Sequence, residues 1–206
     1  MGMRTRAALL IVAMTAAALT ACSDAGNDPA ASGTAPTGDS VSSGATSSSA
    51  SGAPFAASPL RLPRVTAGGT CPVTAAKARP GHPDKVLGTG PLGPIAYYYT
   101  GGDAVLQLRA DDRQPDGQYR AKVRWIGTGY AGPVLIRADR IDGEGSALAE
   151  FSYTGERRDG GFFALLTERD NDIPATTWVS GPGCFAYQVD GTNFTTTIVF
   201  DAVLER

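Results

Sequence analysis

Few side chains in this sequence are spaced as catalysis would require. The only histidine, His82, lies in the Pro-rich stretch RPGHPD, and no G-x-S-x-G elbow is present to hold a nucleophilic serine. The G-x-G-x-x-G match GTGPLG at 88–93 contains Pro91 and precedes the β-rich run IAYYY, whereas a dinucleotide site needs a helix there. We therefore expect neither a Ser-His-Asp triad nor a cofactor.

Acidic pairs provide the one catalytic interpretation that the sequence leaves open. Two carboxylates can act as acid and base in glycoside hydrolysis, and Asp170 and Asp172 are two residues apart. Like the other Asp pairs of the chain, these two stand in or beside expected turns, where Asp commonly bonds the local backbone. An exported hydrolase that uses carboxylates in strand-end loops is therefore the alternative hypothesis, behind a non-catalytic binding or structural role.

A row of cations is the main candidate for a ligand surface. In YRAKVRWI (119–126), Arg120, Lys122 and Arg124 alternate with apolar residues, so a strand would place all three on one face. Gln107 and Arg109 stand on the corresponding face of DAVLQLRA (103–110). Such a row suits an anionic wall polymer or phospholipid, although a solvated outer sheet face is the simpler interpretation.

Aromatic residues could add a stacking surface for sugar rings. Alternation places Trp125 on the apolar face, which predicts core packing. Trp178, in ATTWVSGPG, is not assigned to either face by its surroundings, so it joins the candidate surface. The other aromatic candidates are Tyr97, Tyr98, Tyr99 and Tyr130.

The N-terminus predicts export and lipidation. MGMRTR is followed by the apolar run AALLIVAMTAAALTA (7–21), which is shorter than the ~20 residues of a bilayer-spanning helix. The residues Leu19, Thr20, Ala21 and Cys22 resemble a bacterial lipobox, a signal cleaved just before a cysteine that carries diacylglycerol. We expect residues 1–21 to be a lipoprotein signal peptide and Cys22 to anchor the protein to the outer face of the cell membrane.

Residues 22–60 are expected to form a disordered tether. They are rich in Ser, Gly, Ala, Thr and Pro, as in SVSSGATSSSASGAP, and offer too little apolar surface to offset the entropy of ordering. At 5–6 Å × √n, some 38 flexible residues reach roughly 35 Å. This is enough to carry a domain at 61–206 away from the lipid headgroups and into the wall polymer.

Two cysteines remain, Cys71 and Cys184. An oxidising compartment permits a disulfide between them, and the alternatives are two free thiols or part of a metal site. No second Cys or His lies near either residue, so a zinc ligand set is not expected. The sequence therefore favours a disulfide between the two cysteines, and we expect no metal site.

The segment 61–206 predicts an all-β fold. Period-two alternation recurs in YRAKVRWI, DAVLQLRA and SALAEFSY (146–153), separated by turn sequences such as QPDG, IDGEG and RRDGG. CFAYQV and FTTTIVFDAVL flank Asp190-Gly191, which favours a type I′ hairpin turn. We expect an antiparallel β-sandwich of immunoglobulin-like architecture.

The segments GPVLIRADRIDG (132–143), GPGCFAYQVDGTNFTTTIVF (181–200) and Cys71-Pro72-Val73-Thr74 carry a resemblance. They are similar to those of uncharacterised exported bacterial lipoproteins of actinobacterial type. The resemblance supports pairing of Cys71 with Cys184 and implies no catalytic residue.

The composition narrows the expected partners. With 18 Lys+Arg against 20 Asp+Glu, the chain lacks the basic excess that nucleic acid binding requires. The expected partners are the membrane, through Cys22, and a wall polymer or envelope protein.

Overall fold

The computed structural model describes residues 55–100 and 102–206, and the signal peptide, Cys22 and most of the expected tether lie outside this range. It contains twelve strands and two short 3₁₀ helices. In chain order these are β1 (Ala76–Arg79), β2 (His82–Leu87), β3 (Leu92–Pro94), η1 (Ala96–Tyr98), β4 (Val105–Leu108), η2 (Ala110–Asp112), β5 (Tyr119–Gly127), β6 (Gly132–Arg140), β7 (Ser146–Phe151), β8 (Glu156–Arg158), β9 (Gly161–Leu166), β10 (Asn171–Val179), β11 (Gly183–Gly191) and β12 (Thr195–Leu204).

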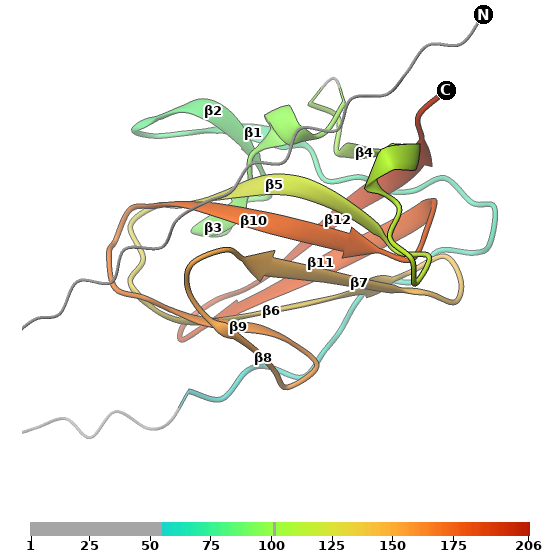
Figure 1. Ribbon diagram of the computed structural model, residues 1–206. Coiled ribbons are helices and arrows are strands. Elements are labelled where there is room, and N and C mark those ends of the chain that lie inside the picture. Colours follow the sequence, from blue (N-terminus) through green and yellow to red (C-terminus); the bar gives the residue numbers. More distant parts are fainter. Residues whose placement is uncertain (1–54, 101) are drawn as a thin grey trace, which may run out of the picture. The chain divides into compact units, whose positions relative to one another are not determined.

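The all-β prediction is confirmed. Strands β1 and β2 form a separate hairpin, and the other ten strands belong to one hydrogen-bonded sheet in the order β3-β5-β10-β7-β6-β11-β12-β4, with β9 on β6 and β8 on β9. All pairs are antiparallel except β12–β4, which is parallel. The finer expectation of an immunoglobulin-like sandwich is not confirmed, because the described strands form one continuous sheet that curls (Figure 1).

Aromatic contacts across the interior show how far the sheet curls. Strands β5 and β11 are separated by three others, yet the rings of Trp125 and Tyr187 lie 5.3 Å apart in a T-shaped arrangement. Tyr187 in turn stacks on Phe200 at 4.7 Å, and its hydroxyl shares a 2.8 Å hydrogen bond with that of Thr177 on β10. These buried rings fill the inside of the curl.

The alternation predicted for β5 and β4 is confirmed. On β5, Val123 and Trp125 are fully buried, while Arg120 and Lys122 are exposed. Leu106 and Leu108 of β4 likewise face the core. Apolar side chains on one face of each strand therefore pack inward, and the outward face of β5 remains available for polar contacts.

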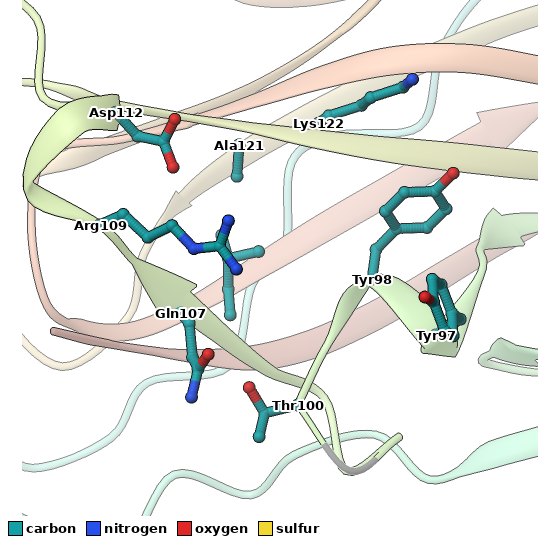
Figure 2. Close-up of a pocket in the computed structure, with 9 residues that line it drawn as sticks. Tyr97, Tyr98, Thr100, Gln107, Arg109, Asp112, Ala121 and Lys122 are labelled. Carbon is teal, nitrogen blue, oxygen red and sulfur yellow. The ribbon is translucent and has the colours of Figure 1, made fainter. Parts of the chain in front are cut away.

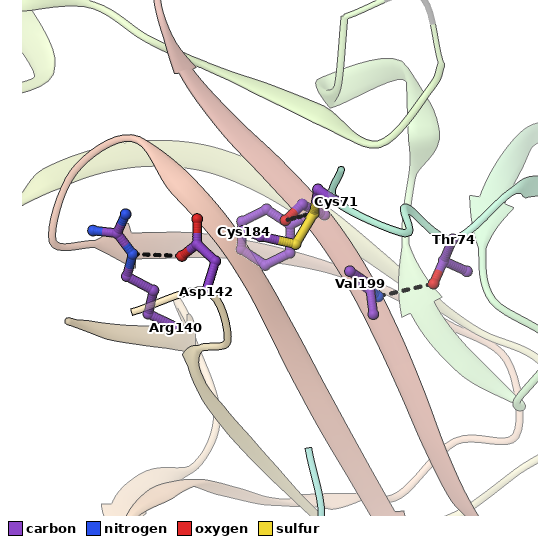
Figure 3. The surroundings of a disulfide bond; sticks show 7 residues. Cys71, Thr74, Arg140, Asp142, Cys184 and Val199 are labelled. Carbon is purple, nitrogen blue, oxygen red and sulfur yellow. Dashed lines mark hydrogen bonds and ion pairs between the residues drawn. A yellow bond between two sulfur atoms is a disulfide. The ribbon is translucent and has the colours of Figure 1, made fainter. Parts of the chain in front are cut away.

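The polypeptide before β1, residues 55–75, forms a strap across the outward face of β11. Leu62, Val65 and Cys71 pack against Cys184 and its apolar neighbours. A disulfide joins Cys71 to Cys184, so the predicted pairing is confirmed (Figure 3). Because the strap covers this face, β11 is buried on both sides along most of its length.

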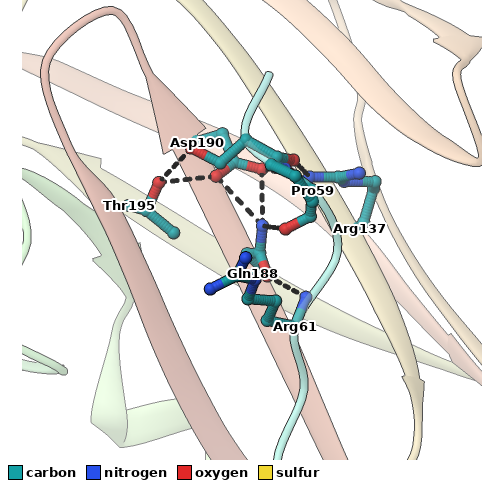
Figure 4. Close-up of polar contacts among 7 residues, drawn as sticks. Pro59, Arg61, Arg137, Gln188, Asp190 and Thr195 are labelled. Atoms are coloured by element: carbon teal, nitrogen blue, oxygen red, sulfur yellow. Dashed lines mark hydrogen bonds and ion pairs between the residues drawn. The ribbon is translucent and has the colours of Figure 1, made fainter.

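The strap is hydrogen bonded to the domain at both ends. Near its C-terminal end, Thr74 donates its N–H to the carbonyl of Val199 and accepts the N–H of Val199 at its hydroxyl (Figure 3). Near its N-terminal end, Gln188 accepts the N–H of Arg61 at 2.7 Å and donates to the carbonyl of Pro59 at 3.1 Å (Figure 4). Ordered contacts thus begin before residue 61, the expected start of the domain.

The hairpin between β11 and β12 is present, but its turn is not at Asp190-Gly191 as predicted. Asp190 pairs with Thr195 within the sheet, and Gly191 closes the hairpin by donating to Phe194. The turn therefore consists of residues 192–193. The positive φ angles of a type I′ turn occur instead at Asp159 (51°) and Gly160 (71°), between β8 and β9.

Candidate functional site

The three cations predicted to share a strand face do so. Arg120, Lys122 and Arg124 project outward from β5, and the register of β10 places Trp178 directly opposite Arg120 and Thr176 opposite Lys122. The structure therefore brings Arg120, Lys122, Arg124 and Trp178 together on the outward face of two neighbouring strands. Tyr99, another aromatic candidate, is instead buried in the core.

The three cations have different electrostatic surroundings. Arg124 donates a hydrogen bond to the carboxylate of Asp172. The negative charge of Asp172, assisted by this hydrogen bond, raises the pKa of Arg124. Arg120 and Lys122 form no ion pair with any residue in the described part of the chain. Their charge is therefore available to an anionic ligand, whereas that of Arg124 is largely neutralised.

A hollow of about 560 Å³ lies where the curled sheet closes without hydrogen bonds. Strand β4 ends the sheet at one side, and it faces β5 with no strand pairing between them. Leu106 and Ala121 form an apolar floor here. We call this the seam hollow, and its rim consists of Tyr97, Tyr98, Thr100, Gln107, Arg109, Asp112 and Lys122.

Charged and aromatic groups converge on the seam hollow. Arg109, just after β4, extends into it, and Tyr98 projects from η1 toward the side occupied by Lys122 (Figure 2). Tyr97 is 82% exposed and stands edge-on to Tyr98, with ring centroids 5.7 Å apart. Gln107 and Arg109 thus line the same hollow as Lys122.

A second hollow continues from the first along the outward face of β5 and β10. Asp112 and Lys122 line both hollows, and Arg120 lines the second. This second hollow, of about 390 Å³, is bordered by Tyr153, a turn residue that is 86% exposed. We call the two hollows together the groove. It is lined by two exposed tyrosines, Tyr97 and Tyr153, and by two cations, Arg120 and Lys122, that lack an ion-pair partner among the described residues.

Trp178 lines a third hollow, of about 550 Å³, beyond Arg120. The indole is half-buried, and its Nε1–H donates a 2.6 Å hydrogen bond to Oε2 of Glu150 on β7. The other carboxylate oxygen of Glu150 accepts a hydrogen bond from Arg157. This bond with Arg157, assisted by that from Trp178, lowers the pKa of Glu150 below its ordinary value.

The acidic pair of the hydrolase hypothesis is engaged in local contacts. Asp170 accepts the backbone N–H of Gly129 at 3.0 Å, and Asp172 pairs with Arg124. His82 lines the same small hollow as these carboxylates, and its Nδ1 accepts the N–H of Asp84 at 3.2 Å. Both carboxylates thus stabilise strand ends, which does not favour their use as an acid–base pair.

A polar cluster that the sequence did not indicate lies beneath the strap. Asp190 is 1% exposed and accepts hydrogen bonds from Arg137 at 2.6 Å, Thr195 at 2.8 Å and Gln188 (Figure 4). Arg137 also donates to the carbonyl of Ser58. We call the side chains of Arg137, Gln188, Asp190 and Thr195 the clasp. They hold the strap, and the burial of Gln188 and Asp190 suits a structural role.

The groove residue Tyr153 escaped sequence reasoning, and Asp112 was considered only as one member of an Asp pair. Both stand in connecting segments, where composition alone does not indicate which hollow a side chain will reach. Within residues 55–100 and 102–206, no three His, Cys, Asp or Glu side chains are grouped closely enough to hold a metal ion. No helix in this part of the chain is long and apolar enough to cross a membrane.

Comparison of the chain with protein-family models, with curated proteins and with solved structures finds no match.

Proposed function

We propose that this chain is an exported lipoprotein of the cell envelope whose β domain binds an anionic envelope polymer without catalysis. The observation that carries the proposal is the groove. Arg120 and Lys122, which have no ion-pair partner in the described chain, line this groove together with the exposed side chains of Tyr97 and Tyr153. An elongated ligand with repeated anionic groups complements such a surface.

The strap and the groove lie on different elements of the domain. The strap begins beside β9, where the rings of Phe55 and Phe163 lie 5.9 Å apart. Strand β9 branches from β6, about halfway along the sheet order between β5 and β4, so this end of the strap lies away from β4 and η1 (Figure 1). No strap residue lines either hollow of the groove, so the strap leaves the groove uncovered.

Support for the anchor comes from the lipobox at residues 19–22 and from the apolar run before it. The disulfide is compatible with export to an oxidising compartment. Cell fractionation of the Cys22→Ala variant tests this part of the proposal. We expect the variant to leave the membrane fraction or to remain unprocessed. Normal processing with full membrane retention would contradict the lipid anchor.

Binding is tested with the mature full-length protein in detergent. The probes are polyglycerol phosphate, a polyuronate and peptide-free peptidoglycan glycan strands, each immobilised. We expect retention on at least one polyanion and its loss in Arg120→Glu/Lys122→Glu. Retention on none of them would overturn polymer binding. Hydrolysis of any probe would overturn the non-catalytic part of the proposal.

A further inference from the structure

The indole of Trp178 is held in a fixed orientation with its only polar atom already used. Its Nε1–H is hydrogen bonded to Glu150, and Glu150 is itself held by Arg157. Leu148 is the cross-strand neighbour of Trp178 on β7 and lines the same hollow. The part of the indole that lines the hollow therefore offers an apolar ring surface and no hydrogen-bond donor.

The polar groups around this ring are mostly engaged by neighbours. Arg157 is bound to Glu150, and Arg158 pairs with Asp159 at 3.2 Å while lying 3.7 Å over the ring of Phe163. The carboxylate of Asp116 accepts the N–H of Gln118 at 3.0 Å. These groups can exchange hydrogen bonds with hydroxyls at the rim, but they leave little net charge. The hollow beside Trp178 thus suits a neutral ring with polar edges, such as a pyranose.

The positive charge that could bind an anion next to Trp178 comes from Arg120 on the neighbouring strand β5. Arg120 is the residue directly opposite Trp178 in the β5–β10 register, and it lacks an ion-pair partner among the described residues. Opposite residues of an antiparallel pair have Cβ atoms about 4.5–5.5 Å apart. A ring lying on Trp178 and an anion bound by Arg120 are therefore separated by no more than one sugar unit.

We infer that Trp178 and Arg120 together recognise an acidic sugar, a pyranose with a carboxylate or phosphate on the same or the adjacent unit, within an envelope polysaccharide. This inference rests on the proposed binding function and specifies its ligand. The C–H face of the pyranose packs on the indole, its hydroxyls meet the polar rim, and the anion meets the guanidinium of Arg120. Lys122, two residues further along β5 on the same face, can take the next anionic unit.

Tryptophan fluorescence can report on this site directly. The chain has only two tryptophans, and Trp125 is fully buried, so a ligand-dependent change in emission arises from Trp178. The probe is a set of peptide-free glycan strands with free lactyl carboxylates, titrated into the mature full-length protein. Strands whose carboxylates are converted to amides are the matched control, because they keep the sugar rings and lose the charge.

We expect a saturable change in Trp178 emission, with Kd at least tenfold weaker for the amidated strands and at least tenfold weaker for Arg120→Gln. Trp178→Ala should weaken binding by a similar factor in a sedimentation assay, and Trp178→Phe by less. Binding that leaves Trp178 emission unchanged, yet depends on Arg120 and Lys122, would overturn this inference and leave the groove proposal intact. The inference would also be overturned if the amidated strands bound as tightly as the carboxylate strands. It would equally be overturned if the protein bound another polyanion but not the glycan strands.

Discussion

Trp178 and Glu150 lie on the paired strands β10 and β7, and the indole Nε1 of Trp178 is 2.6 Å from Oε2 of Glu150. Because Arg157 binds the second oxygen, the carboxylate fixes an aromatic side chain and a cation at once. The orientation of the ring that we assign to ligand binding therefore depends on the charge of one acidic residue on the outward face of the sheet.

Acidification should release Trp178. The pKa of Glu150 is lowered by its bond to Arg157, so the stabilisation is present above the ordinary glutamate pKa and is lost as pH falls through the lower, folded-state value. Trp178 emission should stay constant from neutral pH and change with a midpoint below about 4.3. In Glu150→Gln this transition should be absent. A midpoint above the ordinary value would contradict the assignment.

Loss of the disulfide should strongly destabilise the domain. Cys71 and Cys184 are 113 residues apart, and the chain-entropy model gives about 4–5 kcal/mol for a loop of this size. We expect Cys71→Ser/Cys184→Ser to lower the free energy of unfolding in urea by roughly that amount. Thr74→Val serves as the comparison, because it removes only one hydrogen bond of the strap, worth about 1 kcal/mol. A double variant no less stable than Thr74→Val would show that the bridge contributes little.

Removing one charge of the clasp should lower the free energy of unfolding more than removing both charges. Arg137→Met leaves the buried carboxylate of Asp190 without its cation, which should destabilise the domain by roughly 3–5 kcal/mol. Arg137→Met/Asp190→Leu removes the uncompensated charge and should recover part of this loss in urea unfolding. Additive costs of the two changes would contradict a coupled buried pair.

Hydrogen exchange provides a second readout of the clasp. In Arg137→Met, the amide of Arg61 should exchange faster, because its acceptor Gln188 belongs to the disrupted cluster. The amide of Val199, bonded to Thr74 at the other end of the strap, serves as the internal control. Equal acceleration at both amides would indicate global destabilisation rather than release of one end.

Sequence patterning predicted the inward and outward faces of individual strands well, since side-chain alternation is a local property. Trp125 lies in the core and Lys122 outside, as alternation required. Sequence patterning could not predict how far the sheet curls. The meeting of Lys122 with Arg109 at the seam follows from long-range packing such as that of Trp125 on Tyr187, for which no short segment carries a signal.

The two Asp-Gly pairs show why a local turn signal can fail. Asp159-Gly160 adopts positive φ at both residues and connects β8 to β9. Asp190-Gly191 has the same composition, but the carboxylate of Asp190 is held in the sheet by Arg137 and Thr195. Tertiary hydrogen bonds therefore override the turn preference at the second pair, and those partners lie 53 and 5 residues away in the sequence.

The sequence also failed to predict that the N-terminal part of the strap is ordered, for a related reason. Its residues before 61, FAASPL, end a segment (22–60) that as a whole is rich in small and polar residues, which predicts disorder when the segment is considered alone. In the folded chain, Gln188 and Arg137 supply hydrogen-bond partners for its backbone, and the disulfide at Cys71 limits its entropy. The ordering of the strap thus derives from the surface of β11 rather than from its own sequence.

The groove is tested most directly by charge reversal with a matched control. Arg120→Glu/Lys122→Glu and Arg61→Glu/Arg64→Glu make the same change in net charge, but only the first pair lies in the groove. The measurement is the Kd of the mature protein for the polyanion that it retains, determined at several salt concentrations. We predict at least a tenfold loss of affinity, with reduced salt dependence, in the first variant, and near-normal binding in the second. Equal losses in both variants would contradict a binding site at the groove.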